Sequence, residues 1–286
     1  MPELPEVETV RRNLQGLVAG RRILRVRVTL PRIVRSPDVA EFAARVSQCT
    51  IRDVLRRGKY LLFDLGRDTL VSHLRMEGRY SVKRADDAEE LHTHVVFDLD
   101  GDWQLRYQDV RQFGTMDLVP SDDLTRLAGL RDLGREPLDP SFTGAYLRAA
   151  AARRRTPVKA LLLNQTVVAG LGNIYVDEVL FRARVHPERQ SSELTKGQCD
   201  AIAENARRTI SLAVEAGGSS VRSYVNGLGA QGTFQSLLQV YGRAGQPCAA
   251  CGGAIEKIRV AGRGTHICPR CQRMPGRRQT KGVRKE

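Results

Sequence analysis

The sequence opens with Met1-Pro2-Glu3-Leu4-Pro5-Glu6. Apolar residues then recur every three or four positions, which predicts an amphipathic helix that starts near Pro5: Val7, Val10, Leu14 and Leu17. Proline suits a first helical turn, where its missing N–H would have no partner. If Met1 is removed, Pro2 presents a secondary amine beside two carboxylates, and such an amine can attack a sugar carbon. Taken alone, the stretch fits an ordinary frayed helix start better.

Composition indicates a DNA-binding protein. The chain has 286 residues, enough for two domains, and a formal net charge of +14. This excess favours nucleic acid over a membrane as partner, because no basic helix carries an aromatic face. Aromatic residues make up only 5%, which argues against a single-strand binder built on base stacking. With no signal peptide or spanning segment, we expect a soluble cytoplasmic protein associated with the nucleoid.

Short strands are predicted between Arg21 and Val119. Asp100-Gly101 is a hairpin-turn signal between two of them, and residues 84–90 read as an acidic loop. This spacing is typical of an antiparallel sandwich or barrel. The predicted strands are 23–28, 50–55, 60–65, 69–76, 93–99 and 103–110.

Helical periodicity follows a linker at 134–140. Helices are predicted at 142–153, 157–164, 172–183 and 196–216. A glycine-rich turn at 165–173 gives a helix–two-turn–helix arrangement, in which helix N-termini expose N–H groups suited to phosphate. Residues 217–234 are again loop-like; either they move over a site, or they form a flexible connector, which the sequence alone favours slightly.

Four cysteines form two Cys-x-x-Cys pairs with zinc spacing: Cys248, Cys251, Cys268 and Cys271. Four protein ligands leave no open position, so we expect one structural Zn²⁺. Cys49 and Cys199 read as small buried residues. Between the pairs a hairpin is predicted with its tip at 261–264, where Arg263 is placed to meet phosphate or remains a solvated turn residue. The basic stretch after Cys271 adds salt-sensitive attraction to DNA.

The chain resembles the Fpg/Nei family of DNA glycosylases and AP lyases, in particular its oxidised-purine branch, the formamidopyrimidine-DNA glycosylases. The matching motifs cover nearly the whole chain: Pro2–Thr9, Arg57–Tyr60, His73–Met76, Gln112–Gly114, Gly170–Tyr175, Tyr241–Arg243 and the zinc cysteines. The resemblance implies an α+β fold with an N-terminal helix and antiparallel β-sandwich, a helix–two-turn–helix domain and a zinc ribbon. The expected domains are 1–133, a linker at 134–140, 141–240, 241–274 and a basic tail at 275–286.

The resemblance also implies catalytic roles. Pro2 would attack C1′ of a damaged nucleotide and form an iminium that supports β- and δ-elimination. Glu3 would act as general acid/base, and Glu6 would order the site and its water. Lys59 would contact phosphate near the lesion, although a solvated hairpin lysine is the simpler interpretation of that residue by itself.

DNA contacts are implied for a further set of residues. Lys159 would lie near the damaged base, while Asn173 and Arg263 would grip flanking phosphates. Met76 would fill the space that the flipped base vacates, Phe113 would insert between bases, and Arg111 would hydrogen-bond the orphaned cytosine. Met76 and Phe113 could instead be core residues. His73 and His92 would meet phosphate or serve structural roles. The backbone of residues 219–224 would read the lesion. The other expected contacts are Tyr241 and, in that loop, Ser220 and Arg222.

The expected partner is double-stranded DNA with oxidised purines or abasic sites, bound by a monomer. Two alternatives stay open. An oxidised-pyrimidine glycosylase of the endonuclease VIII type would have a reduced 217–234 loop and would not carry Leu4 in its opening motif. A non-catalytic zinc-ribbon DNA-binding protein would form no covalent adduct with abasic DNA.

Overall fold

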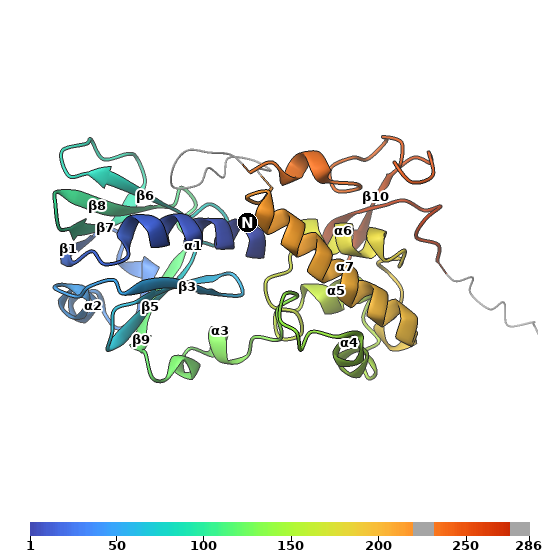
Figure 1. The fold of residues 1–286 in the computed structure, drawn as a ribbon, viewed down its shortest axis with the longest axis horizontal. Coiled ribbons are helices and arrows are strands. Elements are labelled where there is room, and N and C mark those ends of the chain that lie inside the picture. Colours follow the sequence, from blue (N-terminus) through green and yellow to red (C-terminus); the bar gives the residue numbers. More distant parts are fainter. Residues whose placement is uncertain (220–231, 275–286) are drawn as a thin grey trace, which may run out of the picture. The chain divides into compact units, whose positions relative to one another are not determined.

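The computed structural model describes residues 1–219 and 232–274 (Figure 1). It divides into two compact units. The first comprises 1–142, 164–172 and 207–237, and the second comprises 143–163, 173–206 and the chain from 238 onward. None of the described helices is long and apolar enough to cross a membrane.

The first unit is a β-sandwich with helix α1 (Leu4–Val18) packed into it. One sheet has the order β1-β7-β8-β6, and the other has the order β2-β9-β5-β4-β3. The apolar stripe of α1 joins a core with aromatic residues from α2 (Val39–Val46) and both sheets. The strands are β1 (Ile23–Val28), β2 (Val34–Ser36), β3 (Asp53–Arg57), β4 (Tyr60–Asp64), β5 (Asp68–His73), β6 (Arg79–Arg84), β7 (Thr93–Leu99), β8 (Trp103–Gln108) and β9 (Thr115–Pro120).

The antiparallel sandwich expected from the sequence is confirmed, and the structure contains further helices and strands that were not predicted. The first predicted strand and the one at 93–99 have the predicted bounds, and the turn at Asp100-Gly101 joins β7 to β8. The pairing is antiparallel except between β2 and β9, which are parallel. Elements α2, β2, β6 and β9 were not predicted individually. Helix α2 does have helical spacing, at Val39, Phe42 and Val46, and the interpretation of 21–119 as strands missed it.

Buried ion pairs anchor the start of the predicted linker. Arg56 on β3 donates to Glu8 at 3.0 Å and to both carboxylate oxygens of Glu136, at 2.8 and 2.9 Å. Glu136 also accepts the N–H of Gly58 at 2.6 Å. Its pKa lies below the ordinary value: burial acts to raise this pKa, but Arg56, the Gly58 N–H and Arg57 together outweigh burial. Residue 136 is therefore fixed to the β3–β4 turn. Short elements flank the linker: η2 (Leu124–Arg126) and α3 (Ala128–Arg131).

The second unit combines helices with a zinc hairpin. Its helices are α4 (Gly144–Ala151), α5 (Val158–Leu163), α6 (Asn173–Arg182) and the first part of α7 (Lys196–Glu215). Strands β10 (Glu256–Val260) and β11 (Arg263–Ile267) pair antiparallel. Ala261 and Gly262 both have positive φ, 49° and 74°, as a two-residue hairpin turn requires. The tip is thus shorter than predicted, and Arg263 is the first residue of β11.

The buried Arg56 network gives a stability prediction. In Arg56→Met, two carboxylates lose their shared cation, and we expect the free energy of unfolding to fall by about 3 kcal/mol. Urea denaturation of the full chain measures it. Arg25→Met is the matched control, because Arg25 is 75% exposed in its pair with Asp98 and should change stability by less than about 1 kcal/mol. Equal effects of the two substitutions would contradict the network's role.

Candidate active site and DNA interface

The start of α1 is buried and hydrogen-bonded. Pro2 is buried, and Glu3 and Glu6 are only 3% and 4% exposed. Glu3 is the residue that caps the helix, and its N–H donates to the Glu6 carboxylate at 2.9 Å. The N–H of Leu4 donates to the carbonyl of Gly170 at 3.0 Å. The first residues of the chain are therefore held in place rather than frayed.

The turn at 170–172 packs directly against this helix start. A Cβ atom at Gly172 would lie 2.4 Å from the carboxyl carbon of Glu3, and one at Gly170, where φ is +92°, would lie 2.5 Å from Leu4. A side chain at either position would have to displace Glu3 or Leu4. We predicted from the sequence that these glycines expose N–H groups to phosphate; in the structure they allow the turn to contact Glu3 and Leu4.

Glu6 connects α1 to the base of the 217–234 segment. One oxygen of its carboxylate accepts the N–H of Ser219 at 2.7 Å and the hydroxyl of Ser219 at 3.0 Å. The N–H of Ser219 is thus bound to Glu6, whereas we expected backbone amides from this residue onward to read the lesion. The segment closes at its base, where Phe234 N–H donates to the carbonyl of Gly218 at 3.1 Å. Ser220 and Arg222 lie outside the described residues.

The charges around the N-terminal amine come from the predicted catalytic residues. The pKa of the Met1 α-amino group lies below its ordinary value of 8.0, chiefly because of burial. Glu3 and Glu6 act to raise this pKa, and Lys59 acts to lower it. Lys59, in the turn between β3 and β4, is 5% exposed. The structure therefore brings Lys59 into the electrostatic environment of the amine.

The predicted wedge residues are exposed, as the DNA-contacting interpretation requires. Met76 is 39% exposed and Phe113 is 53% exposed, so neither belongs to the core. The guanidinium of Arg111 lies 4.9 Å from the centre of the Phe113 ring. Asp109, which sequence reasoning missed, is 1% exposed and accepts the N–H groups of Arg111 at 3.1 Å and Gly114 at 2.7 Å. This buried carboxylate fixes the loop that carries Arg111 and Phe113.

The two predicted histidines differ in environment. Burial, with help from Arg75 and Lys59, lowers the pKa of His73 to about 3, so its imidazole is neutral at physiological pH. Its Nδ1 accepts the N–H of Arg75 at 2.9 Å, so the ring proton is on Nε2, which is left as the donor. His92 is exposed and has a positive φ of 64°.

Lys159 lies in a different environment from the one expected. It is 0% exposed, and its ammonium donates to Asp177 at 2.6 Å, to the Thr265 hydroxyl at 2.7 Å and to the Gly264 carbonyl at 3.2 Å. Asp177 also accepts the N–H of His266 at 2.8 Å. In this arrangement the ammonium binds β11 next to Arg263.

Asn173 begins α6 and contacts the same hairpin. Its side-chain amide donates to the Gly264 carbonyl at 3.0 Å, while its Oδ1 has no hydrogen-bond partner among the described residues. Arg263, one residue before Gly264, is exposed. The second unit therefore brings together Asn173 and Arg263, the two residues predicted to grip phosphate.

Tyr241 is anchored through its backbone. Its N–H donates to Glu178 on α6 at 2.9 Å, and its ring meets the His266 ring edge-on, with centroids 5.0 Å apart. Glu178 also accepts the N–H groups of Gln239 and Val240. Burial raises the pKa of Glu178, and the three N–H groups oppose this shift. Sequence reasoning missed Asp177 and Glu178, which read as ordinary polar positions of a helix.

The four cysteines fit one zinc ion. Their Sγ atoms all lie within 4.8 Å of one another, with Cys248–Cys271 at 3.9 Å and Cys251–Cys268 at 3.4 Å. Tetrahedral Zn²⁺ with Zn–S bonds of about 2.3 Å needs S···S separations of about 3.8 Å. Val240 and Ile255 pack against Cys248 and Cys268. The zinc is structural and joins the two ends of the hairpin.

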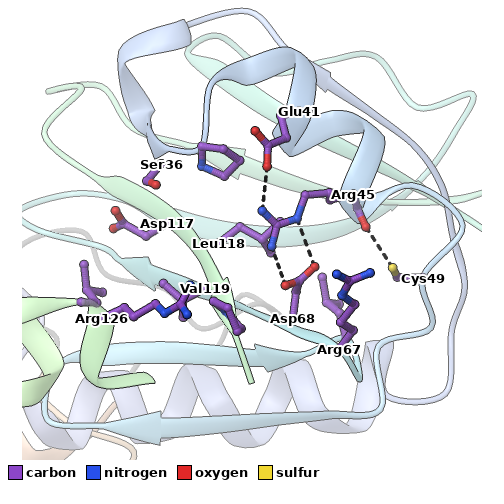
Figure 2. Close-up of a pocket in the computed structure, with 14 residues that line it drawn as sticks. Ser36, Glu41, Arg45, Cys49, Arg67, Asp68, Asp117, Leu118, Val119 and Arg126 are labelled. Atoms are coloured by element: carbon purple, nitrogen blue, oxygen red, sulfur yellow. Dashed lines mark hydrogen bonds and ion pairs between the residues drawn. The ribbon is translucent and has the colours of Figure 1, made fainter. Parts of the chain in front are cut away.

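A hollow of about 760 Å³ in the first unit lies apart from these residues (Figure 2). Its carboxylates are already neutralised: Arg45 donates to Asp68 at 2.6 and 3.2 Å, and Arg35 pairs with Asp117. The Cys49 thiol donates to the carbonyl of Arg45 at 3.1 Å, and burial raises its pKa. The hollow is lined by none of the predicted site residues and offers no unpaired carboxylate for chemistry.

This combination of fold and site defines a DNA glycosylase, an enzyme that acts on the sugar of a nucleotide. Three sequence models of protein families match the chain. Residues 1–116 match the formamidopyrimidine-DNA glycosylase N-terminal domain, and residues 133–225 match the formamidopyrimidine-DNA glycosylase H2TH domain. Residues 245–273 match the zinc finger found in FPG and IleRS. The chain belongs to the formamidopyrimidine-DNA glycosylase family, whose members are glycosylases and AP lyases.

Relatives and solved structures agree with this assignment. The formamidopyrimidine-DNA glycosylases of Brevibacillus brevis and Geobacillus kaustophilus are each 54% identical to it over 274 residues, which cover 96% of this chain and 99% and 100% of theirs. Lactococcus lactis Fpg in complex with DNA containing an abasic site has a TM-score of 0.90 at 42% identity, covering 95% of this chain and 100% of that one. A variant of it in complex with DNA containing Fapy-dG also has a TM-score of 0.90, at 42% identity, covering 96% and 100%.

Gly172→Ala tests the contact between the 170–172 turn and Glu3. The added Cβ would displace Glu3, and a misplacement of about 1 Å can cost 100-fold in rate, so we expect single-turnover strand cleavage to fall about 100-fold. Gly16→Ala is the control within α1, because a Cβ there meets nothing within 4 Å and activity should be unchanged. Parental activity in Gly172→Ala would show that the contact is not needed.

Lys159→Met tests whether the buried lysine holds the zinc hairpin. Asp177 would lose its cation and β11 its anchor, so we expect about tenfold weaker binding to abasic-site DNA, measured by fluorescence anisotropy. Lys196→Met is the control, since Lys196 is 77% exposed in its pair with Asp200. A folded, zinc-loaded Lys159→Met protein that binds DNA like the parent would rule out this role.

Proposed function

We propose that the chain is a bifunctional glycosylase/AP lyase that removes 8-oxoguanine and formamidopyrimidines from duplex DNA and cleaves the strand by β,δ-elimination through Pro2. The observation that carries the proposal is the buried start of α1, where an amine, two carboxylates and Lys59 share one environment. It would act in base excision repair in the cytoplasm, at the nucleoid.

The Pro2 amine starts the reaction. Once Met1 is removed, its nitrogen lone pair attacks C1′ and the C1′–N bond to the base breaks, so the base leaves with the bonding electrons and gains a proton. Opening of the sugar ring between C1′ and O4′ gives an iminium, which carries positive charge without further protonation. Glu3 transfers the proton at the sugar oxygen. Glu6 holds Glu3 through the Glu3 N–H and would order the site and its water.

Elimination then uses the iminium as an electron sink. Loss of a proton from C2′ expels the 3′-phosphate, and a second elimination expels the 5′-phosphate. Water hydrolyses the iminium and regenerates the amine. Burial lowers the pKa of the Met1 α-amino group. The same burial of the chain start would favour the free base of the Pro2 amine, which is the nucleophilic form.

DNA is gripped by cationic and polar groups from both units. Lys59, His73 and His92 would meet phosphate on the first unit, with His73 as a neutral donor. Asn173 and Arg263 would meet it on the second, close to Tyr241. The exposed Met76, Arg111 and Phe113 would fill the space left by the flipped base, and Arg111 would bond the orphaned cytosine. Lys159 would act by positioning the hairpin.

The pH dependence of borohydride trapping with abasic DNA tests the amine. Trapping requires the free base, so its rate should rise with pH and level off above the pKa of the Pro2 amine. Burial, which lowers the pKa of the Met1 α-amino group at this chain end, should also lower that of the Pro2 amine. Pro2→Gly keeps an amine and should give a strongly reduced adduct. No adduct from the mature protein, or a rate that still climbs above pH 9, would contradict the mechanism.

In parallel, excision of 8-oxoguanine opposite cytosine should exceed excision of thymine glycol; the reverse order would indicate the pyrimidine-directed activity.

A further inference from the structure

We propose that a groove on the first unit is a docking site for an acidic, leucine-containing segment of a partner protein. The groove has a volume of about 650 Å³ and is lined by residues of α1, β3, β4, η2 and α3. This volume is within the range of pockets that bind ligands. None of the residues that we place in catalysis or DNA contact lines it. It therefore contains none of the proposed catalytic residues, and its lining residues nearest to them in sequence are Glu8, two positions after Glu6, and Arg57, two positions before Lys59.

Leucines supply the apolar part of the lining. Leu55 on β3 is 47% exposed, which is unusual for a large apolar side chain in a concave surface. Leu62 on β4 lies beside it in the lining and is 6% exposed. Leu124 and Leu130 pack against a small core of Leu62, Val71 and Val119. The apolar lining is thus part of a packed cluster.

Arginines supply the charged part of the lining. The side chains of Arg11, Arg57 and Arg131 are 17%, 37% and 55% exposed. The acidic groups nearby are each paired with arginine. Glu8 is bound by Arg11, Arg12 and Arg56, Glu136 by Arg56 and Arg57, and Asp132 by Arg131. The arginines outnumber these carboxylates, so the groove carries a positive excess.

The combination of leucines and arginines in the lining indicates which kind of molecule would bind in the groove. A DNA backbone would satisfy the arginines but offers no aliphatic group for the leucines. A second copy of the chain, with a formal net charge of +14, would meet like charge at the arginines. A segment with leucines flanked by aspartate or glutamate matches both features, in the manner of amphipathic peptides that lay an apolar face in a groove.

Fluorescence anisotropy with a defined probe tests the proposal on the full zinc-loaded chain. The probe is a fluorescein-labelled peptide, Asp-Glu-Leu-Asp-Glu-Leu-Leu-Asp. Two control peptides replace its leucines by serine or its acidic residues by lysine. Leu55→Asp and Arg131→Glu alter the groove, and Leu24→Asp is the control, because Leu24 is 44% exposed on β1 and does not line the groove. Cleavage of 8-oxoguanine DNA is measured on all variants.

The expected result is saturable binding of the leucine peptide that weakens at least tenfold in Leu55→Asp and in Arg131→Glu and is unchanged in Leu24→Asp. Cleavage activity should be parental throughout. Equal binding of the serine peptide would show that the chain only attracts polyanions, and it would overturn the proposal. Equal binding of the lysine peptide, or no binding of the leucine peptide, would also overturn it. Self-association in sedimentation that Leu55→Asp abolishes would assign the groove to a second copy instead.

Discussion

The close contact between the first turn of α1 and the turn at residues 170–172 is the constraint on which the rest of the site depends. A terminal residue frays unless it is tied down. Here the Leu4 N–H bonds to Gly170, and Gly172 leaves room for the Glu3 carboxylate where any side chain would displace it. Because Glu6 bonds both the Glu3 N–H and Ser219, the same turn of helix also fixes the base of the 217–234 segment.

Buried carboxylates hold the elements that carry the proposed DNA contacts. Asp109 organises the Arg111–Phe113 loop, Asp177 secures the zinc hairpin through Lys159, and Glu178 collects the N–H groups around Tyr241. Glu136 does the same for the turn that bears Lys59. The chain has a formal net charge of +14, and the carboxylates of Asp109, Asp177 and Glu178 are buried. Arg111 and Arg263 stay exposed, which suits attraction to a polyanion.

The sequence predicted most of the fold and the zinc site. The apolar stripe of α1, the cysteine spacing and the strand alternation at 93–99 are local patterns, and the structure confirms each of them. Contacts between distant segments could not be read in this way. Nothing near Gly172 in sequence indicates that Glu3 fills the space beside it, and a lysine in Thr156-Pro157-Val158-Lys159 gives no sign of a buried pair with Asp177. The likeness to a family suggested a role for Lys159 near the base, whereas burial points to positioning.

The central claim is that the tethered N-terminus supplies the nucleophile. Tandem mass spectrometry of the borohydride-trapped complex, after digestion of protein and DNA, locates the adduct directly. The account predicts a deoxyribose-derived mass on the nitrogen of Pro2, in an N-terminal peptide that lacks Met1. An adduct on Lys59 or any other lysine side chain, with the Pro2 peptide unmodified, would contradict it.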